Sequence, residues 1–139
     1  MLSEFIYLLN QMKPYFTKKV NTGFEESIQV IKDILKDYGF GILTEIDVKD
    51  TFKKKIDANF HPYKILGACN PNYALKALTK DDKVGIMLPC NVIVQEHEDG
   101  SVEITIVNPE VAVKALHNAD LEDFACEVTG VMRKVMARL

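Results

Sequence analysis

Two short cysteine-containing segments of similar composition stand on either side of a helix-length insert. The first, residues 66–71, reads LGACNP, and the second, residues 88–92, reads LPCNV. Each places a thiol, a carboxamide and a proline at the end or bend of an apolar run. Binding and catalytic side chains gather at such positions, because a rigid strand there holds an accessible loop. We therefore expect one candidate site, built around Cys69 and Cys90.

Two kinds of chemistry fit these residues. A pair of thiols can form a redox couple in which Cys69 is the nucleophile and Cys90 resolves the mixed disulfide. Cys69 precedes a predicted helix, whose partial positive charge favours a thiolate. The same thiols, with Asn70, Asn91 and Glu45, can instead bind a small ligand or a metal ion without catalysis. We favour the binding module, keep the thiol-dependent redox enzyme as the alternative, and identify no cofactor.

Each candidate also has a structural explanation that needs no function. Free cysteines often serve as small buried hydrophobes, which would account for both Cys69 and Cys90. Asn70 stands directly before Pro71, as expected for a helix N-cap followed by the first helical residue. Glu45 lies within or at the end of an apolar run, and its carboxylate is the acidic candidate for the site.

A metal ion would need a third and a fourth ligand beside the two thiols. The candidates are Glu45, Asp47, His61 and His97. None of them stands at a spacing that recurs in known metal sites, so the metal ligands stay unknown at this level. The chain also has no Gly-rich phosphate loop, G-x-S-x-G or H-E-x-x-H motif, which leaves its reaction class, and whether it is an enzyme, undefined.

The elements that must position these residues alternate between strands and amphipathic helices. Apolar residues recur at helical spacing over residues 22–38 and again over 120–138. Strands are predicted over residues 15–20, 40–46, 63–68, 84–88, 91–97 and 101–107. This order predicts an α+β fold of two layers, in which both long helices cover one face of a mainly antiparallel sheet. Residues 1–13 are predicted to form a helical lead-in, and residues 14–139 a single domain.

The ends of these helices are predicted from their capping residues. Gly39 follows the helix of residues 22–38 and is expected to have a positive φ. Asn70 and Asn108 each precede a proline and are expected to cap the helices that follow. Asp120 is the expected N-cap of the last helix.

The strand pair around residues 99–100 decides which side chains face the core. An Asp-Gly pair is typical of a two-residue type I′ hairpin loop. With that loop, Val92 lies opposite Val107, Asn91 points to the core face, and Cys90 points to the other face.

Composition limits the partners of the chain. Its 139 residues include 17 Lys and Arg against 20 Asp and Glu, a net charge of −3 without a basic block, so no nucleic acid partner is expected. No apolar run reaches the roughly 18 residues that span a membrane, and the first residues lack a positively charged signal-peptide start. Three cysteines form no C-x-x-C pair, which favours reduced thiols and a cytoplasmic location without membrane partners.

Residues 15–139 resemble the bacterial and archaeal family called domain of unknown function 302. The resemblance rests on the segments GFGILTEIDV (39–48), KKK (53–55), PYKILGACNP (62–71) and LPCNV (88–92). It implies a two-layer α+β fold like that of the TATA-binding protein, paired as a homodimer, and it implies no established activity. Similarity to the fold of a DNA-binding protein does not itself indicate DNA binding, because folds host many functions.

A homodimer is also expected from the chain itself. The lead-in helix is apolar, and Cys126 stands beside Gly130 on the polar side of the last helix. The lead-in helix and this side of the last helix both provide surface that a second copy of the chain can cover, and symmetric dimers are the commonest oligomers.

Overall fold

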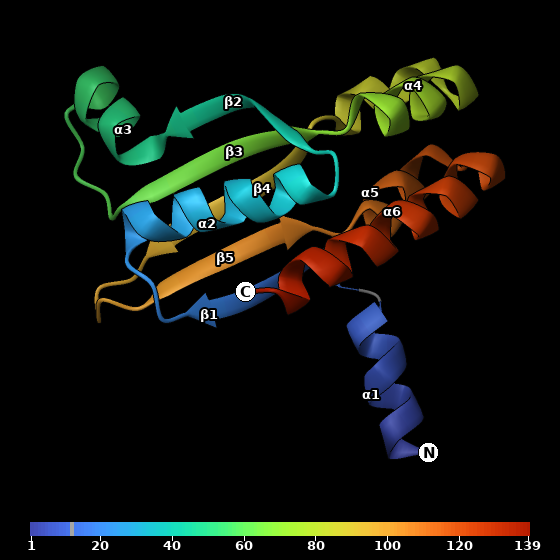
Figure 1. The fold of residues 1–139 in the computed structure, drawn as a ribbon, viewed down its shortest axis with the longest axis horizontal. Helices are drawn as coiled ribbons and strands as arrows, with labels where there is room; N and C mark the ends of the chain where they lie inside the picture. Colours follow the sequence, from blue (N-terminus) through green and yellow to red (C-terminus); the bar gives the residue numbers. More distant parts are fainter. Residues whose placement is uncertain (12) are drawn as a thin grey trace.

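The computed structural model describes residues 1–11 and 13–139 (Figure 1). The helices are α1 (Leu2–Gln11), α2 (Phe24–Asp37), α3 (Val48–Ile56), α4 (Pro71–Lys80), α5 (Pro109–Val113) and α6 (Ala119–Ala137). The strands are β1 (Tyr15–Val20), β2 (Gly41–Asp47), β3 (Tyr63–Cys69), β4 (Cys90–Glu96) and β5 (Val102–Val107). Two short 3-10 helices, η1 (Asp82–Met87) and η2 (Lys114–Leu116), complete the described elements.

The five strands form one antiparallel sheet in the order β1-β5-β4-β3-β2. Helices α2 and α6 pack on the same face of this sheet, as predicted from their apolar stripes (Figure 1). Ile31 and Leu35 of α2 and Met132 and Val135 of α6 are fully buried against it. Along β5, buried and half-buried residues alternate, so the other face of the sheet is more open to solvent. The α+β class is confirmed, while the likeness to the TATA-binding protein stays a prediction.

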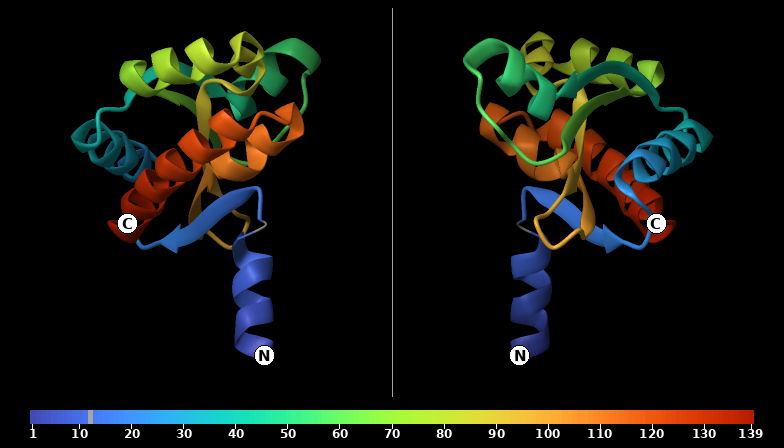
Figure 2. Two further views of the ribbon diagram at one scale, coloured as in Figure 1. Left: turned by 90° about the vertical axis from the view of Figure 1, so that its right-hand side faces the viewer. Right: turned by 90° about the vertical axis from the view of Figure 1, so that its left-hand side faces the viewer.

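Helix α1 forms within the predicted lead-in and extends away from the sheet and its helices (Figures 1 and 2). Residue 12 of that lead-in lies outside the described residues. The division of the chain into a lead-in and a single domain stays a prediction. Among the helices of residues 1–11 and 13–139, none is both long enough and apolar enough to cross a membrane.

The predicted strand over residues 84–88 is wrong, because this segment is the 3-10 helix η1. The Asp81 side chain accepts a hydrogen bond from the Lys83 amide at 2.9 Å, and the Asp81 carbonyl accepts one from the Val84 amide at 3.1 Å. These bonds close a helical turn that buries Val84 and leaves Ile86 exposed. A short apolar run does not distinguish a strand from a buried helical turn by its periodicity.

The predicted hairpin register is also wrong, by one residue. The His97 amide donates to the Ser101 carbonyl at 2.8 Å, and the Gly100 amide donates to the His97 carbonyl at 2.9 Å, with Gly100 at φ +84°. The loop therefore has three residues, a turn followed by a left-handed glycine, rather than two. Val92 pairs with Ile106, so the core and solvent faces of β4 are exchanged relative to the prediction.

The capping predictions hold at the start of α4 and at the end of α2, where Gly39 has φ +83°. Helix α6 begins two residues earlier than predicted, because Asn118, rather than Asp120, accepts from the Leu121 amide at 3.1 Å. Asn108 forms no side-chain cap on α5. Its buried side-chain carboxamide forms hydrogen bonds with residues distant in sequence, and a local motif does not reveal such partners.

Candidate functional site

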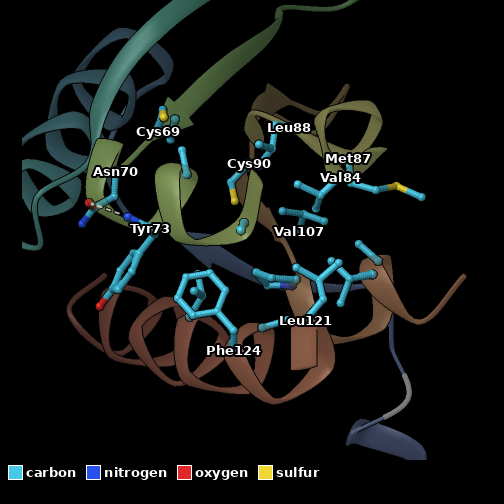
Figure 3. Close-up of a pocket in the computed structure, with 18 of the residues that line it drawn as sticks. Cys69, Asn70, Tyr73, Val84, Met87, Leu88, Cys90, Val107, Leu121 and Phe124 are labelled. Carbon is cyan, nitrogen blue, oxygen red and sulfur yellow. Dashed lines mark hydrogen bonds between the residues drawn. The ribbon is translucent and has the colours of Figure 1, made fainter. Parts of the chain in front are cut away.

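An apolar cavity of about 60 Å³ lies where the end of β3 and the start of β4 meet the helices (Figure 3). Helices α4, α5 and α6 and the 3-10 helix η1 contribute the remaining walls. The lining includes Phe40, Ala68, Cys69, Asn70, Tyr73, Ala74, Ala77, Val84, Met87, Leu88, Cys90, Val107, Pro109, Ala112, Val113, Leu121, Phe124, Ala125 and Val128. Most of these groups are aliphatic or aromatic, so the cavity suits an apolar occupant.

The cavity lies between two apolar clusters. The main cluster, between the sheet and helices α2 and α6, contributes Phe40, Ala68 and Val128 to the lining. A smaller second cluster joins α4, η1, α5 and α6, and consists of the buried residues Ala77, Val84, Val113, Leu121 and Ala125. All five residues of the second cluster line the cavity. The cavity is thus the space that remains where two separately packed clusters meet.

Cys90 is the first residue of β4, and its sulfur points into the cavity (Figure 3). It pairs with Ala68 and faces the main cluster, as does Val92 two residues later. Burial, and to a smaller extent the nearby Cys69 thiol, raises the pKa of Cys90 to about 11. Cys90 is therefore a neutral thiol at neutral pH, and a thiol rather than a thiolate is a poor nucleophile.

Cys69 is the last residue of β3 and lies diagonally across from Cys90, because Ala68 is the direct partner of Cys90. Successive strand residues point to opposite faces of a sheet. Accordingly, the Cys69 sulfur points away from the cavity that the Cys90 sulfur enters (Figure 3). Both cysteines are free. The two predicted site thiols are close along the sheet, but their sulfurs do not face each other.

Asn70 uses both halves of its carboxamide in structural contacts. Its Oδ1 accepts from the amides of Asn72 at 3.0 Å and Tyr73 at 3.4 Å, which caps α4. Its Nδ2 donates to the Tyr38 carbonyl at 3.3 Å, at the end of α2. Only a glycine fits next to this amide, because a Cβ on Gly39 would lie 2.8 Å from Nδ2. Asn70 therefore fixes the start of α4 against the end of α2 and closes one end of the cavity.

Two of the predicted site residues lie outside the cavity. Asn91 is exposed on the opposite face of β4, a correction that follows from the one-residue change of register. Glu45 lies on β2 opposite Leu66, on the face covered by the helices, and forms a 2.5 Å ion pair with Lys32 of α2. The structure thus gathers Cys69, Asn70 and Cys90 at one place and separates Glu45 and Asn91 from them.

Most of the residues that complete the cavity come from helices, and none of them was predicted as a site residue. Tyr73 of α4 packs against Phe40 and Phe124, with ring centroids 6.0 and 5.7 Å apart. In the sequence, these residues are recognisable only as apolar positions of amphipathic patterns. Such a pattern indicates that a side chain is buried, but it does not indicate a cavity. Among the described residues, no three His, Cys, Asp or Glu side chains gather in a way that could hold a metal ion.

The antiparallel sheet with its helices defines a two-layer α+β protein, and comparison with known proteins assigns it to a family. The family described as "Domain of unknown function DUF302" matches residues 16–139, and the chain belongs to this family. An uncharacterized conserved DUF302 protein from Bacillus stearothermophilus, whose crystal structure is known, is similar at 28% identity and a TM-score of 0.84. The match covers 90% of this chain and 97% of that one. No curated protein matches the chain.

Proposed function

We propose that the chain is a non-catalytic module that binds a small apolar molecule in the cavity beside Cys90. The observation that carries this proposal is an apolar cavity between two packed clusters, with a single thiol pointing into it. Small-molecule sites are typically concave, largely apolar and equipped with few polar groups. In this cavity the Cys90 thiol is a weak hydrogen-bond donor that orients a ligand without reacting with it.

The size of the cavity defines the class of ligand. An engineered apolar cavity of about 150 Å³ binds benzene, whereas this one measures about 60 Å³. A ligand as large as one aromatic ring therefore requires a wall to move outward. The wall of α4 and η1 is the least anchored, because each of these helices has a single buried residue, Ala77 in α4 and Val84 in η1. We infer a compact aromatic or branched aliphatic ligand that displaces this wall.

The thiol-dependent redox alternative has less support. A resolving cysteine must reach the sulfur of the mixed disulfide, but the sulfurs of Cys69 and Cys90 point to opposite sides of the sheet (Figure 3). The raised pKa of Cys90 further reduces its ability to attack. A bound metal ion also lacks support, because the described residues offer no set of ligands beyond these two thiols.

We further propose that the protein acts as a cytoplasmic homodimer without a nucleic acid partner. Three free cysteines suit a reducing compartment. The net charge of −3 does not favour binding to a polyanion. The exposed apolar side chains of α1, α3 and β2 provide surface that a second copy can cover.

The test of the ligand site uses benzene and indole as probes. Each is titrated into the full chain while thermal unfolding and amide chemical shifts are recorded. A ligand that binds only the folded state stabilises it by about 1.4 kcal/mol when its concentration is ten times Kd. We expect this stabilisation, together with shift changes at Ala77, Val84 and Leu121.

The matched variants are Ala125→Val and Ala137→Val, both on α6. Ala125 lines the cavity, whereas Ala137 is exposed near the helix end. Ala125→Val fills the cavity and should abolish the stabilisation, while Ala137→Val should retain it. Equal responses of the two variants, or no response of the natural chain to either probe, would contradict the proposed site.

A further inference from the structure

Helix α1 carries an apolar surface that the rest of its own chain leaves uncovered. Its side chains from Leu2 to Leu9 include six apolar residues that are 48–74% exposed: Leu2, Phe5, Ile6, Tyr7, Leu8 and Leu9. At roughly 150–200 Å² per side chain, they expose about 600 Å² of apolar surface, which is as large as the biggest patch on a typical monomer. A patch of this size on a helix that extends into solvent indicates a binding partner (Figure 2).

The same chain has an apolar groove beside α3, on the open face of the sheet. This α3 groove has a volume of about 470 Å³ and is lined by Ile46, Val48, Thr51, Phe52, Phe60, Tyr63 and Ile65. Phe60 packs against Phe52 and Tyr63, with ring centroids 5.2 and 6.0 Å apart. Ile46 and Phe60 remain 47% and 39% exposed. The groove is wide enough for several large apolar side chains of a helix.

The α3 groove lies out of reach of α1 in the same chain. The Asn108 side chain holds the Lys13 carbonyl at 3.0 Å, which fixes the chain just after α1. Tyr63, which lines the groove, is aligned with Lys19 across the sheet through the paired residues of β4 and β5, so the two residues are three strand spacings apart. Six residues along β1 and three strand spacings place the groove about 25 Å from Lys13. The centre of α1 lies only about 15 Å from Lys13, so α1 can reach such a groove only in another molecule.

The charges of the two elements are complementary. Helix α3 and its two cap residues contain four lysines and three aspartates, hence a net charge of +1, whereas the only charged residue of α1 is Glu4. A helix that binds a membrane surface typically has basic residues on its polar face, and α1 has none. A protein groove flanked by lysines therefore suits α1 better than a lipid surface.

We infer that each protomer of the proposed homodimer places its α1 in the α3 groove of its partner. This inference rests on the homodimer proposed above and is independent of the ligand site. A reciprocal exchange is a two-fold arrangement in which each chain supplies one helix and one groove. If half the exposed apolar area of each helix and an equal area of each groove are covered, the interface buries about 1,200 Å², the lower end of the range for stable interfaces.

The experiment compares substitutions on both sides of this contact, with the full chain, by light scattering at micromolar concentration. Phe5→Asp alters the helix and Ile46→Asp alters the groove. Leu75→Asp, at a residue of α4 that is 69% exposed, is the matched control. We expect dimers for the natural chain and Leu75→Asp, and a dimer Kd about a thousandfold weaker for the other two, because each substitution removes a hot spot from both contacts of the dimer. Circular dichroism should show all variants to be folded.

A mixing experiment then tests the exchange itself. A Phe5→Asp chain retains an intact groove, and an Ile46→Asp chain retains an intact α1. An equimolar mixture should therefore form heterodimers through one complete contact, at concentrations where each variant alone is monomeric.

The remaining outcomes separate the two proposals. A dimeric Phe5→Asp variant would overturn the exchange and leave the homodimer standing, as would a mixture that stays monomeric. A monomeric natural chain would overturn both. Binding of that monomer to phosphatidylcholine and phosphatidylglycerol vesicles, lost in Phe5→Asp, would assign α1 to a lipid surface instead.

Discussion

Titration of the Cys90 thiol should lower the free energy of unfolding as the pH rises above about 9. Burial raises the pKa of Cys90 from its ordinary value of 9.0 to about 11 in the folded protein. The Cys90 thiol therefore binds its proton more tightly in the folded state than in the unfolded state. The stability that this proton provides is fully present below pH 9 and is lost as the pH rises toward 11.

The size of the effect follows from the difference between the two pKa values. Two pKa units at 1.36 kcal/mol per unit correspond to about 2.7 kcal/mol, of which about 2 kcal/mol is lost by pH 10.5. This loss is a large fraction of the roughly 5–15 kcal/mol by which domains are stable. It is best measured as a difference between variants, because other groups of the chain also titrate at high pH, among them Tyr63, whose pKa burial raises.

The assay is urea unfolding of the natural chain, Cys90→Ala and Cys126→Ala at several pH values between 8 and 10.5. Cys90→Ala removes the buried thiol. Between pH 8 and 10.5 the free energy of unfolding of the natural chain should therefore decrease by about 2 kcal/mol more than that of Cys90→Ala. Cys126 is exposed, and Cys126→Ala should follow the natural chain throughout.

Parallel pH curves for the natural chain and Cys90→Ala would contradict a buried Cys90 thiol. Such a result would mean that the Cys90 sulfur is as well hydrated in the folded protein as in the unfolded one. The Cys90 sulfur would then not point inward from the start of β4 into the cavity.

Two further substitutions test the supports of the fold, each by urea unfolding. Gly39→Ala should destabilise by about 1–3 kcal/mol, because φ is +83° and the new Cβ would lie 2.8 Å from an amide nitrogen. Gly41→Ala meets nothing within 4 Å and is its control. Thr129→Val should also cost about 1–3 kcal/mol, because the buried Thr129 hydroxyl donates to Asn108 at 3.1 Å. The exposed Thr79→Val should cost less, and equal losses within either pair would contradict these assignments.

The layers of the fold follow from periodicity alone. Long apolar stripes over α2 and α6 predicted two helices on one face of a sheet, and the structure has both there. The segment over residues 84–88 was too short for this reasoning, because five apolar residues fit a buried strand and a helical turn equally well. Asp81 decides between them by capping the turn. The capping residue is present in the sequence, but the apolar run that follows it also favours a strand.

The orientation of Cys90 could not be predicted, because it depends on one residue of loop length. An Asp-Gly pair fits a two-residue loop and also the end of a three-residue loop with a left-handed glycine. In the structure the His97 amide bonds to the Ser101 carbonyl, which selects the longer loop. The change exchanges the two faces of β4 and brings Cys90, rather than Asn91, to the core. Small differences in a turn thus decide which side chain reaches the site.

The two Asn-Pro pairs show what a local motif leaves undefined. Asn70 caps α4 as the motif predicts. Asn108 has the same neighbour but is fully buried, and its carboxamide instead joins the Lys13 carbonyl to the Thr129 hydroxyl, at 3.0 and 3.1 Å. A buried amide must satisfy its hydrogen bonds with whatever the tertiary structure places nearby.

The nearness of Cys69 and Cys90 has a topological reason. Where one strand ends and the neighbouring antiparallel strand begins, the two segments lie at the same end of the sheet, so Cys69 and Cys90 had to be close. Which sulfur faces the helices depends on register, and the cavity depends on how α4 and α6 pack beside those strand ends. Which side chains line a site of this kind is therefore decided by the tertiary structure and not by a local sequence motif. For this reason the cavity beside Cys90, rather than the reactivity of either thiol, is the feature that an experiment on function should probe first.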